Sequence, residues 1–344
     1  MTELLILLGG GIKALTEYLS VHVLACLVPA FFIAGGISAF ISTAAVLKYF
    51  GPSAKKILSY SVASVSGAIL AVCSCTVLPL FGAIYKRGAG LGPAVTFLYA
   101  APAINILAVV YSARLLGYDL GVARAIIAIV FSIVLGLAMA WLYRKEEAGK
   151  KTQAFVLPQD SPGAKSPIQQ LVFIGTLLGI LIFAAASNWI MTALMLAALG
   201  YVLWRWFSRG EIKHWLTETL RYVRLILPWL LGGVFIAGVL TIIIPEDVIA
   251  TFVGDNSLLS NFTASFVGML MYFATLTEVP IIKALMDLGM AKGPALALLL
   301  AGPALSLPNL LVIRKIMGTK KALTYAALVV ILSTFAGFIF GLVQ

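Results

Sequence analysis

Residues 322–344 read ALTYAALVVILSTFAGFIFGLVQ, a stretch without a single charged side chain. An α-helix rises 1.5 Å per residue, so about 20 consecutive apolar residues span the hydrocarbon core of a bilayer. Other charge-free runs are also long enough: residues 18–47, 57–85, 88–113, 125–143, 166–204, 225–245, 256–277 and 293–313. The run 166–204 has room for two spans, with a turn expected at Ser187-Asn188. The sequence therefore predicts an all-α polytopic membrane protein, with a single membrane domain over residues 1–344.

Composition indicates that lipid, rather than water, surrounds most of the chain. Hydrophobic residues make up 62% and charged residues 11%, whereas soluble domains carry about 25% charged residues. The net charge of +11 does not predict a nucleic-acid partner, because the basic residues form short clusters between apolar runs. We expect the lipid bilayer and a small-molecule substrate as partners, with no cofactor and no cleavable signal peptide.

The chain repeats itself at an offset of 201 residues. Leu15-Thr16-Glu17 recurs as Leu216-Thr217-Glu218, and Gly92-Pro93-Ala94 recurs as Gly293-Pro294-Ala295. Matching Gly and Pro residues indicate matching interruptions of the backbone. The sequence therefore predicts two repeats with a common fold, residues 12–143 and 212–344, joined by two spans within residues 166–208.

The charges of the loops predict how the repeats are oriented. Basic loops face the cytoplasm, and the basic segments here are residues 48–56, 144–165, 205–224 and 314–321. Segment 246–255 carries three acidic and no basic residues, so we expect it outside. The two repeats then have inverted topology, which is typical of secondary transporters. Segment 144–165, rich in charge, Pro and Gly, is predicted to be a flexible cytoplasmic linker.

This orientation requires an odd number of crossings between residue 57 and residue 117. The simplest solution is a re-entrant hairpin over residues 57–88, with its tip at Cys73–Pro79, followed by a crossing over residues 91–117 that is broken at Pro102. The second repeat would mirror this with a tip at Thr275–Pro280 and a break at Pro303–Pro308. The prediction is about eight full spans and two re-entrant helical hairpins. Ten or more simple spans are the alternative, and Arg114, Arg124, Lys283 and Lys292, which this topology places outside, disagree with it mildly.

The predicted interruptions also define the candidate transport site. Irregular backbone at membrane depth persists only where protein or water satisfies its polar groups, and transporter sites lie near the midplane. The helix breaks are expected at Pro79, Pro102, Pro280, Pro303 and Pro308, unless these residues only kink packed helices. Polar side chains beside them are candidate substrate contacts: Cys73, Ser74, Cys75, Thr76, Asn105, Thr277, Ser306 and Asn309.

Two of these candidates, Cys73 and Cys75, form a C-x-C pair beside a proline. Thiolates bind soft partners such as Cu(I) and Zn(II), and trivalent arsenic is another thiophile, so a metalloid contact is one interpretation. The alternative is that both are small buried apolar residues, as free cysteines often are. Cys26 has no partner in sequence and is expected to serve packing.

Glu278 is a single carboxylate within an apolar segment. A charged side chain inside a membrane costs several kcal/mol, so it marks a functional hypothesis. We expect Glu278 to exchange a proton during transport. The alternative is a helix-capping carboxylate near the membrane surface.

The motif Cys73-Ser74-Cys75-Thr76-Val77-Leu78-Pro79, followed by Ala101-Pro102-Ala103-Ile104-Asn105, resembles the predicted permease family that includes ArsP. The resemblance covers nearly the whole chain and implies a multi-pass permease of the cell inner membrane. For the ArsP branch it implies efflux of trivalent organoarsenicals such as methylarsenite, and hence arsenic resistance.

The combined prediction is a proton-coupled secondary transporter that exports small soft-metalloid compounds, and not an enzyme. The chain has no G-x-x-x-x-G-K-[ST] phosphate-binding loop, so no ATP hydrolysis of its own is expected. The alternatives are a permease for another small solute with incidental cysteines, a membrane thiol oxidoreductase, and a passive channel.

Overall fold

The computed structural model describes residues 2–19, 27–40, 55–70, 74–147, 166–185, 188–243, 252–271 and 278–344. These residues fold into helices, and no strand occurs among them. The helices before the predicted linker are α1 (Thr2–Tyr18), α2 (Val28–Phe40), α4 (Lys56–Leu70), α5 (Ser74–Lys86), α6 (Leu91–Ala103), α7 (Ile106–Leu116) and α8 (Tyr118–Leu142). Those after it are α10 (Pro167–Ala185), α11 (Trp189–Trp206), α12 (Arg209–Ile243), α14 (Leu258–Leu270), α15 (Glu278–Asp287), α16 (Lys292–Ala301), α17 (Leu307–Met317) and α18 (Thr319–Val343).

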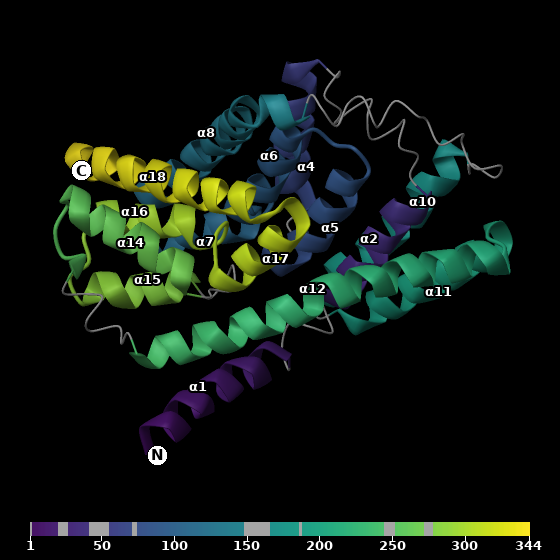
Figure 1. Ribbon diagram of the computed structural model, residues 1–344, viewed down its shortest axis with the longest axis horizontal. Helices are drawn as coiled ribbons and strands as arrows, with labels where there is room; N and C mark the ends of the chain where they lie inside the picture. The colour runs from purple at the N-terminus through teal and green to yellow at the C-terminus, as the bar shows by residue number, and fades with distance from the viewer. Residues whose placement is uncertain are drawn as a thin grey trace.

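The described helices form one packed assembly. Figure 1 shows α12 along one side of the molecule, with α1 beside it, and α14, α15, α16 and α18 gathered at one end. Helices α2 and α17 also pack against α12. Helix α6 lies against both α4 and α8, and α16 lies against both α14 and α18.

Four helices of the described part are long and apolar enough to cross a membrane: α8, α11, residues 209–239 of α12, and α18. Helices α6 and α7 together would form a fifth span, bent by 45° at the break between them, or a re-entrant loop. Large apolar side chains point outward on these helices, including Trp141 (75% exposed) and Trp204 (81% exposed). These features are those of a polytopic membrane protein, while eight spans and two re-entrant hairpins stay a prediction.

Helix boundaries recur at the offset of 201 residues. Helices α7 and α17 begin at Ile106 and Leu307 and end at Leu116 and Met317, and α8 and α18 show the same correspondence. The glycines with positive φ recur as well: Gly88 with Gly289, and Gly117 with Gly318. Positive φ strongly favours glycine, so the repeated glycines end corresponding helices.

Glycine also sets the closest helix contacts. A Cβ atom on Gly136 of α8 would lie 2.7 Å from the Gly92 carbonyl oxygen of α6. The matching pair in α18 and α16 is Gly337 and Gly293, where the same distance is 2.5 Å. Small residues let membrane helices approach closely enough for backbone contact. In each half, the last helix therefore packs closely on an earlier helix through a pair of facing glycines, which we call a glycine crossing.

The expected turn between the two linking spans is confirmed at its second residue. Asn188 precedes α11, and its side chain accepts a hydrogen bond from the Met191 N–H at 3.2 Å. This is an N-cap, which satisfies one of the free donors of the first helical turn.

The five prolines of the proposed breaks lie at different places in their helices. Pro79 lies inside α5, whereas Pro280 lies in the first turn of α15. Proline is tolerated in the first turn because its missing N–H is not needed there, and neighbouring groups satisfy the backbone around an internal proline. Pro102 comes just before the end of α6, Pro303 lies in the turn after α16, and Pro308 lies in the first turn of α17.

The predicted flexible linker is partly ordered and bound. Residues 144–147 are helical, and the Glu147 carboxylate pairs with the Lys321 ammonium of α18 at 2.8 Å. The Tyr143 hydroxyl lies 2.7 Å from the Thr324 hydroxyl. The start of segment 144–165 is therefore docked on α18, which corrects the prediction there, and residues 148–165 lie outside the described part.

Candidate transport site

The break between α6 and α7 has a satisfied backbone. The Ile104 N–H donates to the Ala100 carbonyl at 2.9 Å, and the Asn105 carbonyl accepts from the Val109 N–H at 2.9 Å. Asn105 is buried between the two helices. The helix is interrupted at residues 104 and 105, directly after Pro102 and Ala103.

The break between α16 and α17 leaves polar side chains without partners. Ser306, which matches Asn105 at the repeat offset, is the N-cap of α17, but its side chain caps no N–H group. Its Oγ and the Oδ1 of Asn309 are buried and have no hydrogen-bond partner among the described residues. A buried unsatisfied polar group costs about 1–3 kcal/mol, and such groups call for an explanation. At the positive end of a helix, they are available to a polar ligand or water.

The other predicted substrate contacts are only partly placed. Thr76 is buried on α5. The structure places Ser74 and Cys75 in the backbone of the first turn of α5. Their side chains, and the residues Cys73 and Thr277, lie outside the described part. The predicted metalloid contact through Cys73 and Cys75 therefore stays a prediction.

Packing brings the candidate elements together in two pairs, each joining the two halves. Helix α5, which carries Thr76, contacts α17, which carries Ser306 and Asn309. Helix α7, which follows Asn105, contacts α15, which begins at Glu278.

Glu278 forms a buried ion pair. Its Oε1 lies 2.5 Å from Nη2 of Arg124 on α8, and the two side chains are 1% and 0% exposed. The Arg124 Nη1 donates to the Ser112 hydroxyl of α7 at 2.9 Å, and that hydroxyl donates to the Ala108 carbonyl at 2.7 Å. As the first residue of α15, Glu278 also benefits from the positive end of that helix.

Pairing offsets part of the cost of burying these two charges. Each buried ion loses several kcal/mol of hydration, and a partner at contact distance compensates for much of that loss. The compensation is incomplete, because Oε2 of Glu278 and Nε of Arg124 have no hydrogen-bond partner among the described residues. The ion pair therefore contains polar atoms whose hydrogen bonds no described residue satisfies.

Sequence reasoning found Glu278 but missed its partners, Arg124 and Ser112. The topology predicted from loop charge places Arg124 outside. The signal was present, since a lone cation and a lone carboxylate in apolar segments are expected to pair inside a membrane protein. No spacing rule links residues 124 and 278, so only the fold joins them.

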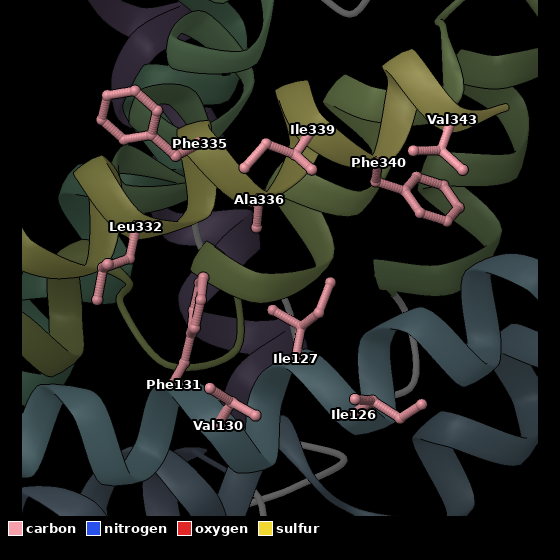
Figure 2. Close-up of a pocket in the computed structure, with 10 residues that line it drawn as sticks. All are labelled: Ile126, Ile127, Val130, Phe131, Leu332, Phe335, Ala336, Ile339, Phe340 and Val343. Atoms are coloured by element: carbon pink, nitrogen blue, oxygen red, sulfur yellow. The ribbon is translucent and has the colours of Figure 1, made fainter.

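An apolar groove lies between α8 and α18, shown in Figure 2. Its volume is about 560 Å³, and its lining includes Phe131, Leu332, Phe335 and Phe340. All the lining side chains are apolar, and Ile126 and Ile339 among them are more than half exposed. This groove offers no polar group to a substrate and is suited to contact with lipid.

The chain resembles known proteins over its full length. It matches the ArsP_1 family, described as a predicted permease, over residues 9–342. It is 46% identical over 361 residues to the UPF0718 protein MJ0584 of Methanocaldococcus jannaschii, covering 100% of this chain and 98% of that protein. It is 26% identical over 267 residues to the UPF0718 protein YraQ of Escherichia coli, covering 77% of this chain and 63% of that protein. No solved structure matches the chain.

The apolar helices and the family match together define a multi-pass membrane protein of the permease class. The chain belongs to the ArsP_1 family of predicted permeases. Membership in this family points to a transporter of small molecules rather than an enzyme, as the sequence predicted.

Proposed function

We propose that this permease exports trivalent organoarsenicals such as methylarsenite and that proton entry through Glu278 drives the export. The observation that carries the proposal is the buried Arg124–Glu278 pair, which joins α8 of the first half to α15 of the second. An ionisable pair inside a membrane protein, with unused polar atoms, is the arrangement expected of a proton site.

The substrate would lie between the two interrupted helix pairs. The buried hydroxyl of Ser306 and the amide oxygen of Asn309 support this, because they lack partners in the described residues and lie at the start of α17. Methylarsenite is a neutral dihydroxy compound in water, so its hydroxyl groups would both donate to and accept from such groups. Asn105, Thr76 and Thr277 would complete the polar lining, with Cys73 and Cys75 supplying a weak thiol contact.

Alternating access would follow from two inverted repeats, residues 12–143 and 212–344. The matching boundaries of α7 with α17 and of α8 with α18 support this arrangement. Eight spans and two re-entrant hairpins, with segment 144–165 in the cytoplasm, complete the proposal.

The test is methylarsenite accumulation in everted inner-membrane vesicles, with and without a proton gradient. The wild type is compared with the double variant Cys73→Ser/Cys75→Ser, and Cys26→Ser serves as the matched control. We expect gradient-dependent accumulation in the wild type and in the control, with strong loss in the double variant.

The other outcomes are equally informative. Accumulation that survives in the double variant would keep the exporter and remove the thiol contact. Correctly inserted wild type that accumulates no methylarsenite would refute the arsenical substrate. It would favour a permease for another small polar solute, which the unpartnered Ser306 and Asn309 also accommodate.

A further inference from the structure

The Arg124–Glu278 pair breaks the repeat symmetry of the chain. At the offset of 201 residues, Arg124 matches Tyr325 and Glu278 matches Val77, so neither matching residue is charged. Tyr325 instead donates its hydroxyl to the Ala304 carbonyl at 3.2 Å, within its own half. Val77 is buried in the apolar core. The two halves thus place corresponding positions in different surroundings.

The helix break between α6 and α7 also differs from its counterpart between α16 and α17. Helix α6 continues through Ala103, whereas α16 ends at Ala301, which matches Ala100, and residues 302–304 form a turn. At the second break, the hydroxyl groups of two tyrosines donate hydrogen bonds to the carbonyl oxygens of Leu300 and Ala304. Equivalent sequence positions therefore adopt two conformations in one molecule.

Inverted repeats relate the two access states of a transporter, because each half can adopt the conformation that the other half shows. In the exchanged state Arg124 would take the position that Tyr325 has now. Its guanidinium would then reach the Ala103 carbonyl, which matches Ala304. Glu278 would take the surroundings of Val77, where an unpaired carboxylate is costly and binds a proton instead.

We propose that Arg124 alternates between two acceptors, the Glu278 carboxylate in the present state and the Ala103 carbonyl in the exchanged state, and that Glu278 carries the transported proton when Arg124 leaves it. This role rests on the proposed secondary-transport function. One proton enters the site when the ion pair opens, and the charge of the site changes from zero to +1.

The charged groups near Glu278 are consistent with a switch in which Arg124 is the ionic partner of its carboxylate. Helix α15 packs against α7 and α16, whose cations Arg114 and Lys292 are exposed. Among the described residues, Arg124 of α8 is the cation that pairs with the carboxylate. Arg124 therefore controls the charge of the site.

The first measurement separates coupling from transport in proteoliposomes that contain the purified full-length chain. For one proton per substrate, a gradient of one pH unit drives about tenfold accumulation of methylarsenite. We expect Glu278→Gln to lose this accumulation but to keep exchange of labelled for unlabelled methylarsenite at equal pH. Ser333→Ala is the control, since Ser333 is buried on α18 with an unpartnered hydroxyl, and it should retain both modes.

Exchanging the two charged residues distinguishes the proposed switch from an ion pair that only stabilises the fold. Arg124→Glu/Glu278→Arg rebuilds the ion pair, so thermal stability should recover relative to either single change. It removes the donor to the Ala103 carbonyl, however, so gradient-driven accumulation should stay lost. Recovery of accumulation together with stability would overturn the proposal.

Hydrogen–deuterium exchange supplies a readout that needs no substrate. Compared with wild type at the same pH, Glu278→Gln should speed exchange in peptides over residues 101–104 and slow it over residues 302–305. Equal acceleration in both segments would indicate plain destabilisation and refute the switch. If wild type moves no methylarsenite, the proposed substrate fails, while this opposite response still decides the role of Arg124.

Discussion

At the residue scale, the buried polar groups fall into two kinds, those with a partner and those without. Arg124 reaches both Glu278 and Ser112. Ser306 and Asn309 hold polar atoms with no partner among the described residues. Paired groups are expected to stabilise the fold, whereas unpaired ones are expected to serve a ligand at some cost in stability.

Removing one member of the ion pair should destabilise the protein strongly. Arg124→Gln or Glu278→Gln leaves an uncompensated charge in a buried site, which costs about 3–5 kcal/mol. The double variant Arg124→Gln/Glu278→Gln should lose much less, because neither charge remains. Unfolding of the four proteins in detergent, analysed as a double-mutant cycle, measures the coupling. Additive losses would mean that the two side chains do not interact in the membrane protein.

The two serines near the proposed site should respond in opposite ways. Ser306→Ala removes a hydroxyl that has no partner, so stability should change by less than about 1 kcal/mol while substrate transport weakens. Ser112→Ala removes an acceptor from the Arg124 guanidinium and should cost about 1.5–3 kcal/mol. Unfolding curves and transport rates of both variants provide the comparison. A large stability loss in Ser306→Ala would show that its hydroxyl has a structural partner.

At the element scale, glycine crossings hold α8 on α6 and α18 on α16. The crossing pairs are Gly92 with Gly136 and Gly293 with Gly337, which are related by the repeat offset. A Cβ atom on Gly136 or Gly337 would lie within 3 Å of the facing carbonyl oxygen and closer still to a side-chain oxygen, that of Thr96 or Asn261. These helices therefore pack too closely for a larger residue at either glycine.

Adding one methyl group at a crossing should separate the helices. Gly136→Ala and Gly337→Ala each place a Cβ atom against a carbonyl oxygen, so we expect a loss of about 1–3 kcal/mol from overpacking. Gly200→Ala is the matched control, because a Cβ atom there meets nothing within 4 Å. It should be neutral or slightly stabilising, since alanine favours helix more than glycine does. Thermal unfolding of the three variants makes the comparison, and equal behaviour would refute the crossing.

At the scale of the whole molecule, the proposed orientation of the halves gives each loop a side of the membrane. Segment 144–165 is expected in the cytoplasm and segment 246–255 outside. Glu147, at the start of the first segment, is bound to Lys321 of α18. The start of α18 should therefore share the cytoplasmic side with residue 147.

Membrane-impermeant maleimide labelling tests this orientation. In a background with Cys26, Cys73 and Cys75 changed to Ser, Thr152→Cys should be labelled only in everted vesicles. Gly254→Cys should be labelled only in intact cells, because its segment is acidic and expected outside. Labelling of both positions from one side would refute the inverted topology.

The sequence by itself determined that the chain lies in a lipid bilayer and where several of its helices are interrupted. Charge-free runs predicted membrane helices, and Pro102, Pro303 and Asn188 lie at or next to interruptions. These features are local, because hydrophobic length and turn chemistry act over a few residues. Pro79, by contrast, lies inside α5. A proline inside a membrane helix is tolerated where neighbouring helices satisfy its backbone, and the local sequence does not show those neighbours.

Only the tertiary structure decided the partner of Glu278. Arg124 lies far from Glu278 in the sequence, and the topology predicted from loop charge places it outside. Packing of α15 against α7, and of α7 against α8, brings the two charges together. A charge pair forms wherever desolvation makes isolation more costly than contact. That choice depends on the three-dimensional neighbours of each charge, so local sequence could flag the carboxylate but not its cation.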